Sequence, residues 1–464
     1  MKIKLKYLGA LKQAEFTLGD FTILCGSNNT GKTYATYALF GFLSYWQESL
    51  MEGRLIDLSD KEIDILFNEG VIHVNIEKYI ERVPELLDTF CKQYTDKLPE
   101  VFASSNEKFK ESQFIVQTCV NEIQLIENYE QRIKAGNSEV LIIKKTENDL
   151  SISLLIEQSK LKVPREAIKW TVNKIMDYII LGNLFPKPFI ASAERTGAAI
   201  FRKELNFARN RALEAMGQDK NADPRDLLSK IYQDYALPVK ENVDFTRQLE
   251  SIAKKSSFIA TQYPEILQDF ADIIGGEYKV TDNDELYYVP KGKKKVNLTM
   301  DESSSAVRSL LDIGFYLKHI AEPGHLLMAD EPELNLHPEN QRRVARLFAR
   351  LVNLGIKVFI TTHSDYIVKE LNTLIMLNND KPYLKAIAEQ EGYKREELIS
   401  FEKIKVYIAD KALIKLDGAR NRTICATLIS ADVNPELGIE ARSFDTTIET
   451  MNRIQESIVW GEDE

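Results

Sequence analysis

The chain has 464 residues, of which 60 are Lys or Arg and 70 are Asp or Glu, giving a net charge of −10 at pH 7. Hydrophobic residues make up 44% and charged residues 28%, the composition of an ordinary globular protein, which excludes a disordered tail protein and a collagen-like fibre. The acidic balance argues against a uniformly basic nucleic-acid coat, and the length indicates two or three structural units.

Residues 1–40 are predicted to form two strands, a glycine-rich loop and a helix. The apolar run 21–25 is rich in strand formers, and residues 34–40 continue as a helix. Between them, Gly26-Ser-Asn-Asn-Thr-Gly-Lys-Thr33 fits the phosphate-loop pattern GxxxxGK followed by Ser or Thr. The position between a strand and a helix favours a nucleotide site over the alternative, a turn rich in Gly and Asn.

Each fixed position of this loop has a physical reason. Glycines let the backbone wrap closely around phosphates, and the N–H groups at the start of the helix point inward as donors. Lys32 is expected to reach the terminal phosphates, and the Thr33 hydroxyl to complete the shell of a magnesium ion. The residues expected to bind the nucleotide here are Gly26, Asn28, Asn29, Thr30, Gly31, Lys32 and Thr33.

Residues 41–184 are predicted to form an inserted, mostly helical lobe. Helical spacing of apolar residues covers the ranges 46–66, 76–97 and 112–134. The apolar runs 140–145 and 150–156 flank Glu147-Asn148-Asp149, a pattern that predicts a hairpin.

Residues 185–200 return to the head with a strand after a proline break, and 201–295 form a second, largely helical insertion. Strands at 278–280 and 285–289 predict a hairpin near its end. Asp282 and Asp284 fit a hairpin turn better than a metal-binding pair. The basic run 291–295 is interpreted as a solvated tip, with a DNA contact as the alternative.

From residue 300 onward, helices and strands alternate, which predicts a mostly parallel sheet. Residues 1–40, 185–200 and 296–378 are therefore expected to form one α/β head, on which residues 379–464 pack as a C-terminal extension. The predicted helices are 307–321, 338–353 and 364–371, and the predicted strands are 325–329, 357–362 and 374–377.

Acidic and imidazole groups follow two of these strands. Asp330 comes at the carboxyl end of an apolar strand, where an open parallel sheet binds its ligands, and it is expected to hold magnesium. Glu331 is one residue further, where it can polarise an attacking water. His363 follows another strand and is expected to contact the terminal phosphate or the water. The alternative for the acidic pair is a helix-capping loop.

These motifs occur in the order found in ABC-type ATPases of the SMC and RecF branch. The segments 330–338 (DEPELNLHP) and 361–366 (TTHSDY) resemble the Walker B, D-loop and switch-histidine motifs of that family. The resemblance covers roughly residues 1–40 and 296–378. It implies an ABC-type P-loop ATPase head, interrupted by two largely helical insertions, with ATP and Mg²⁺ as cofactors.

The segment 303–310 (SSSAVRSL) is similar to the signature segment of the same family. The resemblance implies a head-to-head homodimer, in which Ser304 and the backbone at Ser305 of one copy reach the γ-phosphate held by the other. Ser305 and Ala306 replace the usual two glycines, and their Cβ atoms hinder close approach to phosphate, so we expect weak closure or turnover. The alternative is an ordinary Ser-rich helix cap. Glu194-Arg195 is a candidate for a group near the nucleotide.

The two insertions are split by strands and prolines, so they lack the sustained heptads of a long coiled coil. A compact head with helical lobes resembles the stand-alone ATPases of bacterial anti-phage systems, above all the Septu ATPases (PtuA), which work with an HNH nuclease. The sequence has no HNH or HxxH pattern. We therefore expect an ATP-binding sensor subunit, as a homodimer or a higher oligomer, that controls a separate nuclease effector.

Two other functions stay open. The first is a RecF-like DNA-repair ATPase that binds duplex DNA. Four arginines lie along one face of a predicted helix, where they form either ion pairs within the chain or a ridge that contacts DNA phosphates. The second is a nucleotide-locked scaffold with negligible turnover. The four arginines are Arg342, Arg343, Arg346 and Arg350.

Location is predicted from the cysteines and the apolar runs. The four cysteines lie far apart without a CxxC pair, which excludes a disulfide framework and a standard cysteine zinc site. No apolar run approaches the roughly 18–20 residues that span a bilayer, and residues 1–7 alternate as a strand does instead of forming a signal peptide. We expect a cytoplasmic protein with reduced thiols and no membrane contact.

Overall fold

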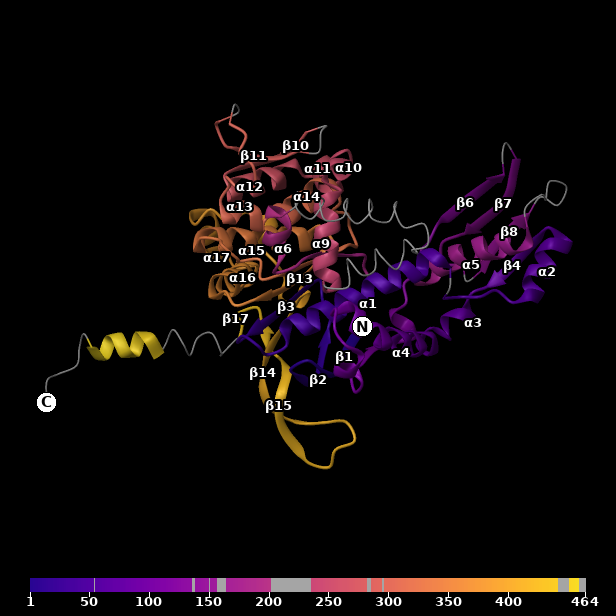
Figure 1. Ribbon diagram of the computed structural model, residues 1–464, viewed down its shortest axis with the longest axis horizontal. Coiled ribbons are helices and arrows are strands. Elements are labelled where there is room, and N and C mark those ends of the chain that lie inside the picture. The colour runs from indigo at the N-terminus through magenta and orange to yellow at the C-terminus, as the bar shows by residue number, and fades with distance from the viewer. Residues whose placement is uncertain are drawn as a thin grey trace, which may run out of the picture. The chain divides into compact units, whose positions relative to one another are not determined.

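The computed structural model describes residues 1–53, 55–135, 138–149, 151–156, 164–201, 235–281, 285–293, 296–440 and 450–458 (Figure 1). The chain divides into two compact units. The insert unit comprises residues 1–3, 42–96 and 114–187, and the head unit comprises residues 4–41, 97–113 and 188–464. The predicted turn at Asp282–Asp284 and the end of the basic run, Lys294 and Lys295, lie outside the described residues, as do residues 202–234 of the second insertion.

The head unit contains a six-stranded sheet in the order β15-β14-β3-β13-β12-β9. Strand β3 pairs in parallel with β13 and β14, β12 pairs in parallel with β13 and β9, and β15 adds an antiparallel edge. The strands are β3 (Phe21–Gly26), β9 (Pro188–Ala191), β12 (Leu326–Asp330), β13 (Lys357–Thr362), β14 (Ile404–Lys415) and β15 (Arg422–Ser430).

This sheet confirms the predicted fold class, an α/β head with a mostly parallel sheet. Strands β3 and β12 are buried along their whole length, because both faces of a parallel sheet are covered. Their continuous apolar runs made them predictable. The predicted strand 374–377 is wrong, since these residues end helix α16 (Asp365–Leu377), whose apolar positions Leu371, Leu374 and Ile375 are buried at helical spacing.

Helices cover the sheet. The predicted helix 338–353 is confirmed as α15, whereas the predicted helix 307–321 is two helices, α13 and α14, that meet at Leu310. Besides α16, the helices described in this part of the chain up to residue 440 are α1 (Lys32–Glu52), α6 (Arg195–Ile200), α9 (Leu237–Arg247), α10 (Leu249–Ala253), α11 (Phe258–Gln262), α12 (Pro264–Ile274), α13 (Ser305–Ser309), α14 (Leu311–His319), α15 (Pro338–Asn353) and α17 (Pro382–Gln390).

Small sheets and turns complete the head unit. The predicted hairpin near residue 280 is confirmed as the antiparallel pair β10 and β11. These smaller elements are β1 (Lys2–Leu8), β2 (Leu11–Thr17), β10 (Gly276–Val280), β11 (Leu286–Pro290), β16 (Val433–Asn434), β17 (Gly438–Ile439) and the 3₁₀ turns Asn106–Phe109, Arg395–Glu397 and Phe401–Lys403.

The C-terminal part of the chain contributes to the sheet itself. Residues 379–464 were expected to pack on the head as an extension, but residues 404–409 of β14 pair directly with residues 21–26 of β3. Strand β3 therefore has a parallel neighbour on each side, one from β13 and one from β14. The sequence pattern missed β14 because it mixes charged and apolar residues, as the half-exposed part of a strand does.

The insert unit combines helices with an antiparallel sheet in the order β4-β8-β7-β6. The predicted hairpin around Asn148 is confirmed by the pairing of β7 with β8. The predicted helix 112–134 is wrong, because β5 and β6 lie in this range. The elements are α2 (Asp60–Glu69), α3 (Glu77–Ile80), α4 (Val83–Val101), α5 (Arg165–Leu181), β4 (Val71–Asn75), β5 (Gln113–Gln117), β6 (Tyr129–Ala135), β7 (Ser138–Lys145), β8 (Ser151–Ile156) and the 3₁₀ turn Val120–Glu122.

Aromatic side chains form the core of the insert unit. The ring of Phe42 stacks on Phe114 at a centroid distance of 4.9 Å and meets Phe185 edge-on at 5.1 Å. Trp46, wholly buried, contacts Phe185 and Phe90 edge-on at 4.8 and 5.0 Å. Offset and edge-on pairs of this kind add to the free energy gained by burying apolar area.

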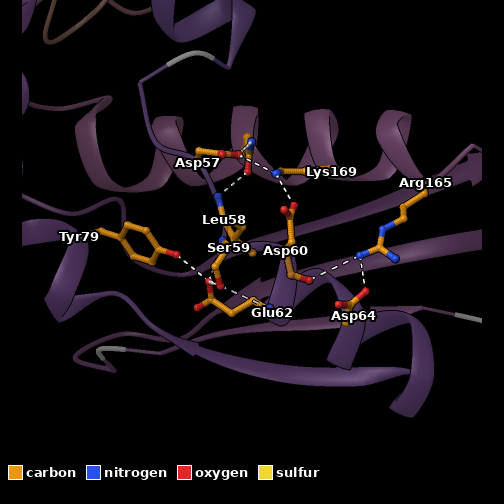
Figure 2. A network of polar contacts seen from close by, with 10 residues as sticks. Asp57, Leu58, Ser59, Asp60, Glu62, Asp64, Tyr79, Arg165 and Lys169 are labelled. Atoms are coloured by element: carbon orange, nitrogen blue, oxygen red, sulfur yellow. Dashed lines mark hydrogen bonds and ion pairs between the residues drawn. The ribbon is translucent and has the colours of Figure 1, made fainter.

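The predicted single helix over 46–66 is wrong, because α1 ends at Glu52 and α2 begins at Asp60. A polar network holds the chain between the two helices. The side chains of Asp177 and Asn173 on α5 accept hydrogen bonds from the backbone N–H groups of residues 55, 56 and 58. Ser59 then caps α2 in a capping box with Glu62. Lys169 of α5 donates to Asp60 at 2.9 Å beside this cap, and Figure 2 shows the two side chains facing each other.

Among the described residues, no helix is both long and apolar enough to cross a membrane. All four cysteines are free thiols, and Cys119 is the exposed one.

Candidate nucleotide site

Parallel pairing brings the predicted motifs to one edge of the head sheet. Cys25 of β3 pairs with Thr362 of β13, and Thr361 pairs with Asp330 of β12. Since the carboxyl ends of these neighbouring strands share one edge, the loop at 26–33 and the acidic pair meet there although about 300 residues separate them.

The loop at 26–33 has a backbone that only glycine tolerates at its first position. Gly26 has a φ of +123°, and a Cβ there would lie 2.5 Å from the carbonyl oxygen of Ala409 in β14. Asn29 also has a positive φ, +60°, which asparagine adopts more readily than most residues. Ser27, Asn28 and Asn29 are exposed, so the loop presents its tip to solvent.

Lys32 begins helix α1 and lies inside the loop. Its Nζ donates to the carbonyl oxygens of Gly26 at 3.0 Å and Ser27 at 2.7 Å. Burial lowers the pKa of Lys32, while the negative charges of Glu331 and Asp330 oppose that shift. The ammonium group is therefore within electrostatic reach of the acidic pair. Thr33 follows it at the exposed start of the helix.

Asp330 is a buried carboxylate with a free oxygen. The Thr361 hydroxyl donates to Oδ1, whereas Oδ2 has no hydrogen-bond partner among the described residues. Burial raises the pKa of Asp330 to about 6. A buried carboxylate oxygen without a partner is costly unless a cation binds it, and carboxylate and hydroxyl oxygens are ligands that Mg²⁺ prefers. The free oxygen of Asp330 therefore fits a magnesium ion, and Thr33 as a second ligand stays a prediction.

Glu331 lies beside His363. Its backbone has a positive φ of +50°, and its N–H donates to the hydroxyl of Thr361 at 3.0 Å. The Glu331 Oε1 is 3.5 Å from the His363 Nε2, and both side chains are partly exposed. The contact with His363 lowers the pKa of Glu331. Glu331 is thus an ionised carboxylate with access to water, as a group that orients a nucleophilic water must be.

Glu333 is a residue of the site that the sequence reasoning missed. Its Oε1 accepts hydrogen bonds from the His363 N–H at 2.6 Å and the Thr362 hydroxyl at 2.9 Å. Its Oε2 is buried without a partner among the described residues, and burial raises its pKa. Glu333 therefore fixes the backbone that carries His363. The available signal was a third acidic residue in the DEPE run.

The two serines of the signature-like segment occupy the start of α13. Ser304 is the N-cap residue, and its hydroxyl accepts a hydrogen bond from the Val307 N–H at 3.3 Å. Ser305 is the first residue of the helix. The Ser304 side chain therefore caps a helix, as the alternative interpretation predicted. The role of both serines toward a second copy stays a prediction.

Glu194 and Arg195 follow β9 at the same edge of the sheet. The Tyr37 hydroxyl of α1 donates to Glu194 Oε2 at 2.8 Å, which links this turn to the helix that begins with Lys32. Arg195 is buried, and it donates to the carbonyl oxygens of Asp330 and Glu331. The candidate pair therefore lies at the site, with Arg195 behind the acidic pair and removed from solvent.

Asp312 of α14 is expected to make the stability of the protein depend on pH. Burial raises its pKa to about 7, from 3.8 when exposed. The contribution of Asp312 to the free energy of unfolding therefore falls as the pH rises from 4 to 7, by on the order of 4 kcal/mol in total. Asp312→Asn mimics the protonated carboxyl, so the variant should unfold at higher urea than wild type at pH 8 and at similar urea at pH 4. Parallel pH profiles for the two proteins would contradict the prediction.

The arginine stripe on α15 is occupied by ion pairs within the chain. Arg342 and Arg346 both bind Glu370, at 2.7 and 2.5 Å, and Arg350 binds Asp269. Arg343 is 3.5 Å from Glu339 on its own helix. Lys291 of the basic run pairs with Asp272 at 2.5 Å. These contacts favour the ion-paired interpretation over a ridge that contacts DNA.

Comparison with known proteins identifies the family. Residues 1–368 match the sequence family that is described as AAA ATPase domain. The chain belongs to this AAA ATPase domain family. The match spans both the phosphate loop and the acidic pair, so the expected P-loop ATPase head is confirmed, and ATP is the nucleotide that this family implies.

Solved structures that match the chain include SMC head domains. An SMC head bound to the C-terminal winged-helix domain of ScpA has 14% identity and a TM-score of 0.32, covering 92% of this chain and 97% of that chain. The SMC head domain from Thermotoga maritima has 10% identity and a TM-score of 0.29, covering 93% and 98%. A Pyrococcus furiosus SMC head with an extended coiled coil has 15% identity and a TM-score of 0.29, covering 98% of each chain. No curated protein matches the chain.

Proposed function

We propose that this protein is a cytoplasmic ATP-binding regulatory subunit that pairs head to head with a second copy on ATP and controls a separate nuclease in an anti-phage defence system. The observation that carries the nucleotide part is the meeting of Lys32 with Asp330, whose free buried oxygen fits a cation. The resemblance of the motifs and of the split insertions to stand-alone defence ATPases such as the Septu ATPases supports the regulatory part.

The residues of the site divide the work of binding and hydrolysis. Lys32 exchanges its two backbone carbonyl partners for the β- and γ-phosphates, and the N–H groups at the start of α1 bind their oxygens. Asp330 and Thr33 would hold Mg²⁺, which would neutralise phosphate charge. Glu331 orients a water and takes its proton, and His363, fixed by Glu333, faces the terminal phosphate.

Ser304 and Ser305 of one copy contact the γ-phosphate held by the other copy in this proposal. The extra Cβ atoms at Ser305 and Ala306 restrict how closely the backbone approaches phosphate, so turnover is slow. A RecF-like DNA-binding function is disfavoured by the ion pairs of Arg342 and Arg346. A scaffold that binds ATP without turnover stays the second candidate, favoured by the same two side chains.

Calorimetry and analytical ultracentrifugation test this proposal. We expect the protein to bind ATP·Mg²⁺ with a micromolar dissociation constant and to sediment as a dimer with ATP but not with ADP. Absence of heat on ATP addition would contradict the nucleotide site, and a monomer at saturating ATP would contradict the head-to-head pair. Co-expression with the product of the adjacent gene, followed by a DNA-cleavage assay with and without ATP, tests the control of a nuclease.

A further inference from the structure

Arg195, the first residue of α6, is a buried cation held by neutral groups. Its side chain is 1% exposed, and its guanidinium donates four hydrogen bonds to backbone carbonyl oxygens. The acceptors are Ser309 at 2.6 Å, Ser192 and Asp330 at 2.7 Å, and Glu331 at 2.9 Å.

These four carbonyl groups belong to three different elements. Ser192 follows β9, Asp330 and Glu331 stand at the end of β12, and Ser309 is the last residue of α13. One rigid guanidinium thus joins the acidic pair of the nucleotide site to the helix that Ser304 caps. Because the N–H donors of a guanidinium lie in one rigid plane, they fix the relative positions of the four acceptors. The ammonium of a lysine, on its flexible side chain, would not fix them in this way.

The charge of Arg195 has a counter-ion that makes no hydrogen bond. Asp312 on α14 is buried within electrostatic reach of the guanidinium, but its two carboxylate oxygens have no hydrogen-bond partner among the described residues. Burying a cation costs free energy that neutral carbonyl groups offset only in part. An apolar side chain at position 195 would leave these four carbonyl oxygens without their donor, so Arg195 is the group that holds their elements together.

We propose that Arg195 is a positioning residue that couples the strand end carrying Asp330 and Glu331 to helix α13. When ATP·Mg²⁺ binds and the strand end adjusts, the guanidinium carries the adjustment to the carbonyl of Ser309 and so to the helix that presents Ser304 to a second copy. This inference rests on the proposed nucleotide site, and it concerns a contact within one chain, so it holds whether or not ATP is hydrolysed.

Hydrogen exchange of backbone amides in Arg195→Lys tests the coupling. We expect ATP·Mg²⁺ to slow exchange in peptides covering 26–33 and 305–309 of the wild type. In the variant, the response at 26–33 should persist and the response at 305–309 should be lost. Arg350→Lys is the matched control, because Arg350 is also buried in the head unit but pairs with Asp269 and Glu265 of α12. The control should keep both responses.

The outcomes separate the two proposals. A nucleotide response at 305–309 in Arg195→Lys equal to that of the wild type would overturn the coupling, as would a wild type that responds at 26–33 alone. A wild type without any response at 26–33 would instead overturn the nucleotide site. If Arg195→Lys does not fold, Arg195→Gln, which is neutral and needs no buried counter-ion, is measured in its place against the same expectations.

Discussion

Replacing Lys32 with alanine is expected to weaken the binding of ATP·Mg²⁺ on the order of 100-fold without lowering the melting temperature. Each hydrogen bond from an ammonium to a charged oxygen contributes roughly 1.5–3 kcal/mol, and about 1.4 kcal/mol corresponds to a factor of ten in affinity. The melting temperature should not fall, because the hydrogen bonds of Lys32 go only to two carbonyl groups of its own loop. Burial also lowers the pKa of Lys32, which means that the folded state disfavours its charged form. Isothermal calorimetry and thermal melts measure the two effects.

Lys12→Ala serves as the matched control, because Lys12 is an exposed lysine on β2 of the same head unit. The control should bind ATP·Mg²⁺ as the wild type does. Equal affinities in Lys32→Ala and the wild type would mean that nucleotide binds elsewhere or that the loop carries no phosphate contact. A large fall in the melting temperature of Lys32→Ala would show that the lysine is structural.

The phosphate loop and the acidic pair could be predicted from sequence because each is a local pattern. A run of buried residues predicts a parallel strand, and polar groups that follow two such strands must meet at one edge of the sheet. Lys32 and Asp330 illustrate this, since only the parallel pairing of β3, β13 and β12 was needed to bring them together.

The residues that the sequence did not reveal act through contacts between distant elements. Glu333 bonds to the backbone of His363, a contact that carries no sequence signal. Arg195 was predicted to lie near the nucleotide, but its bonds to backbone carbonyl groups could not be predicted. The requirement for Gly26 comes partly from Ala409, a residue of a strand that the sequence pattern did not predict. The predicted helix at 112–134 failed for a related reason, since tertiary pairing overrode the helical spacing of its apolar residues.

Glu331→Gln is expected to lower the rate of phosphate release by about 10²–10⁴-fold while ATP·Mg²⁺ still binds, because the amide cannot accept the proton of the attacking water. Affinity should persist, since Lys32, Thr33 and Asp330 are unchanged. The variant should therefore accumulate in the ATP-bound form and sediment as a dimer for longer than the wild type. A phosphate-release assay at saturating ATP measures the rate, and Glu339→Gln, at an exposed position on α15, is the control. Equal and near-zero rates in Glu331→Gln and the wild type would favour the nucleotide-locked scaffold, because a site that never turns ATP over cannot lose turnover.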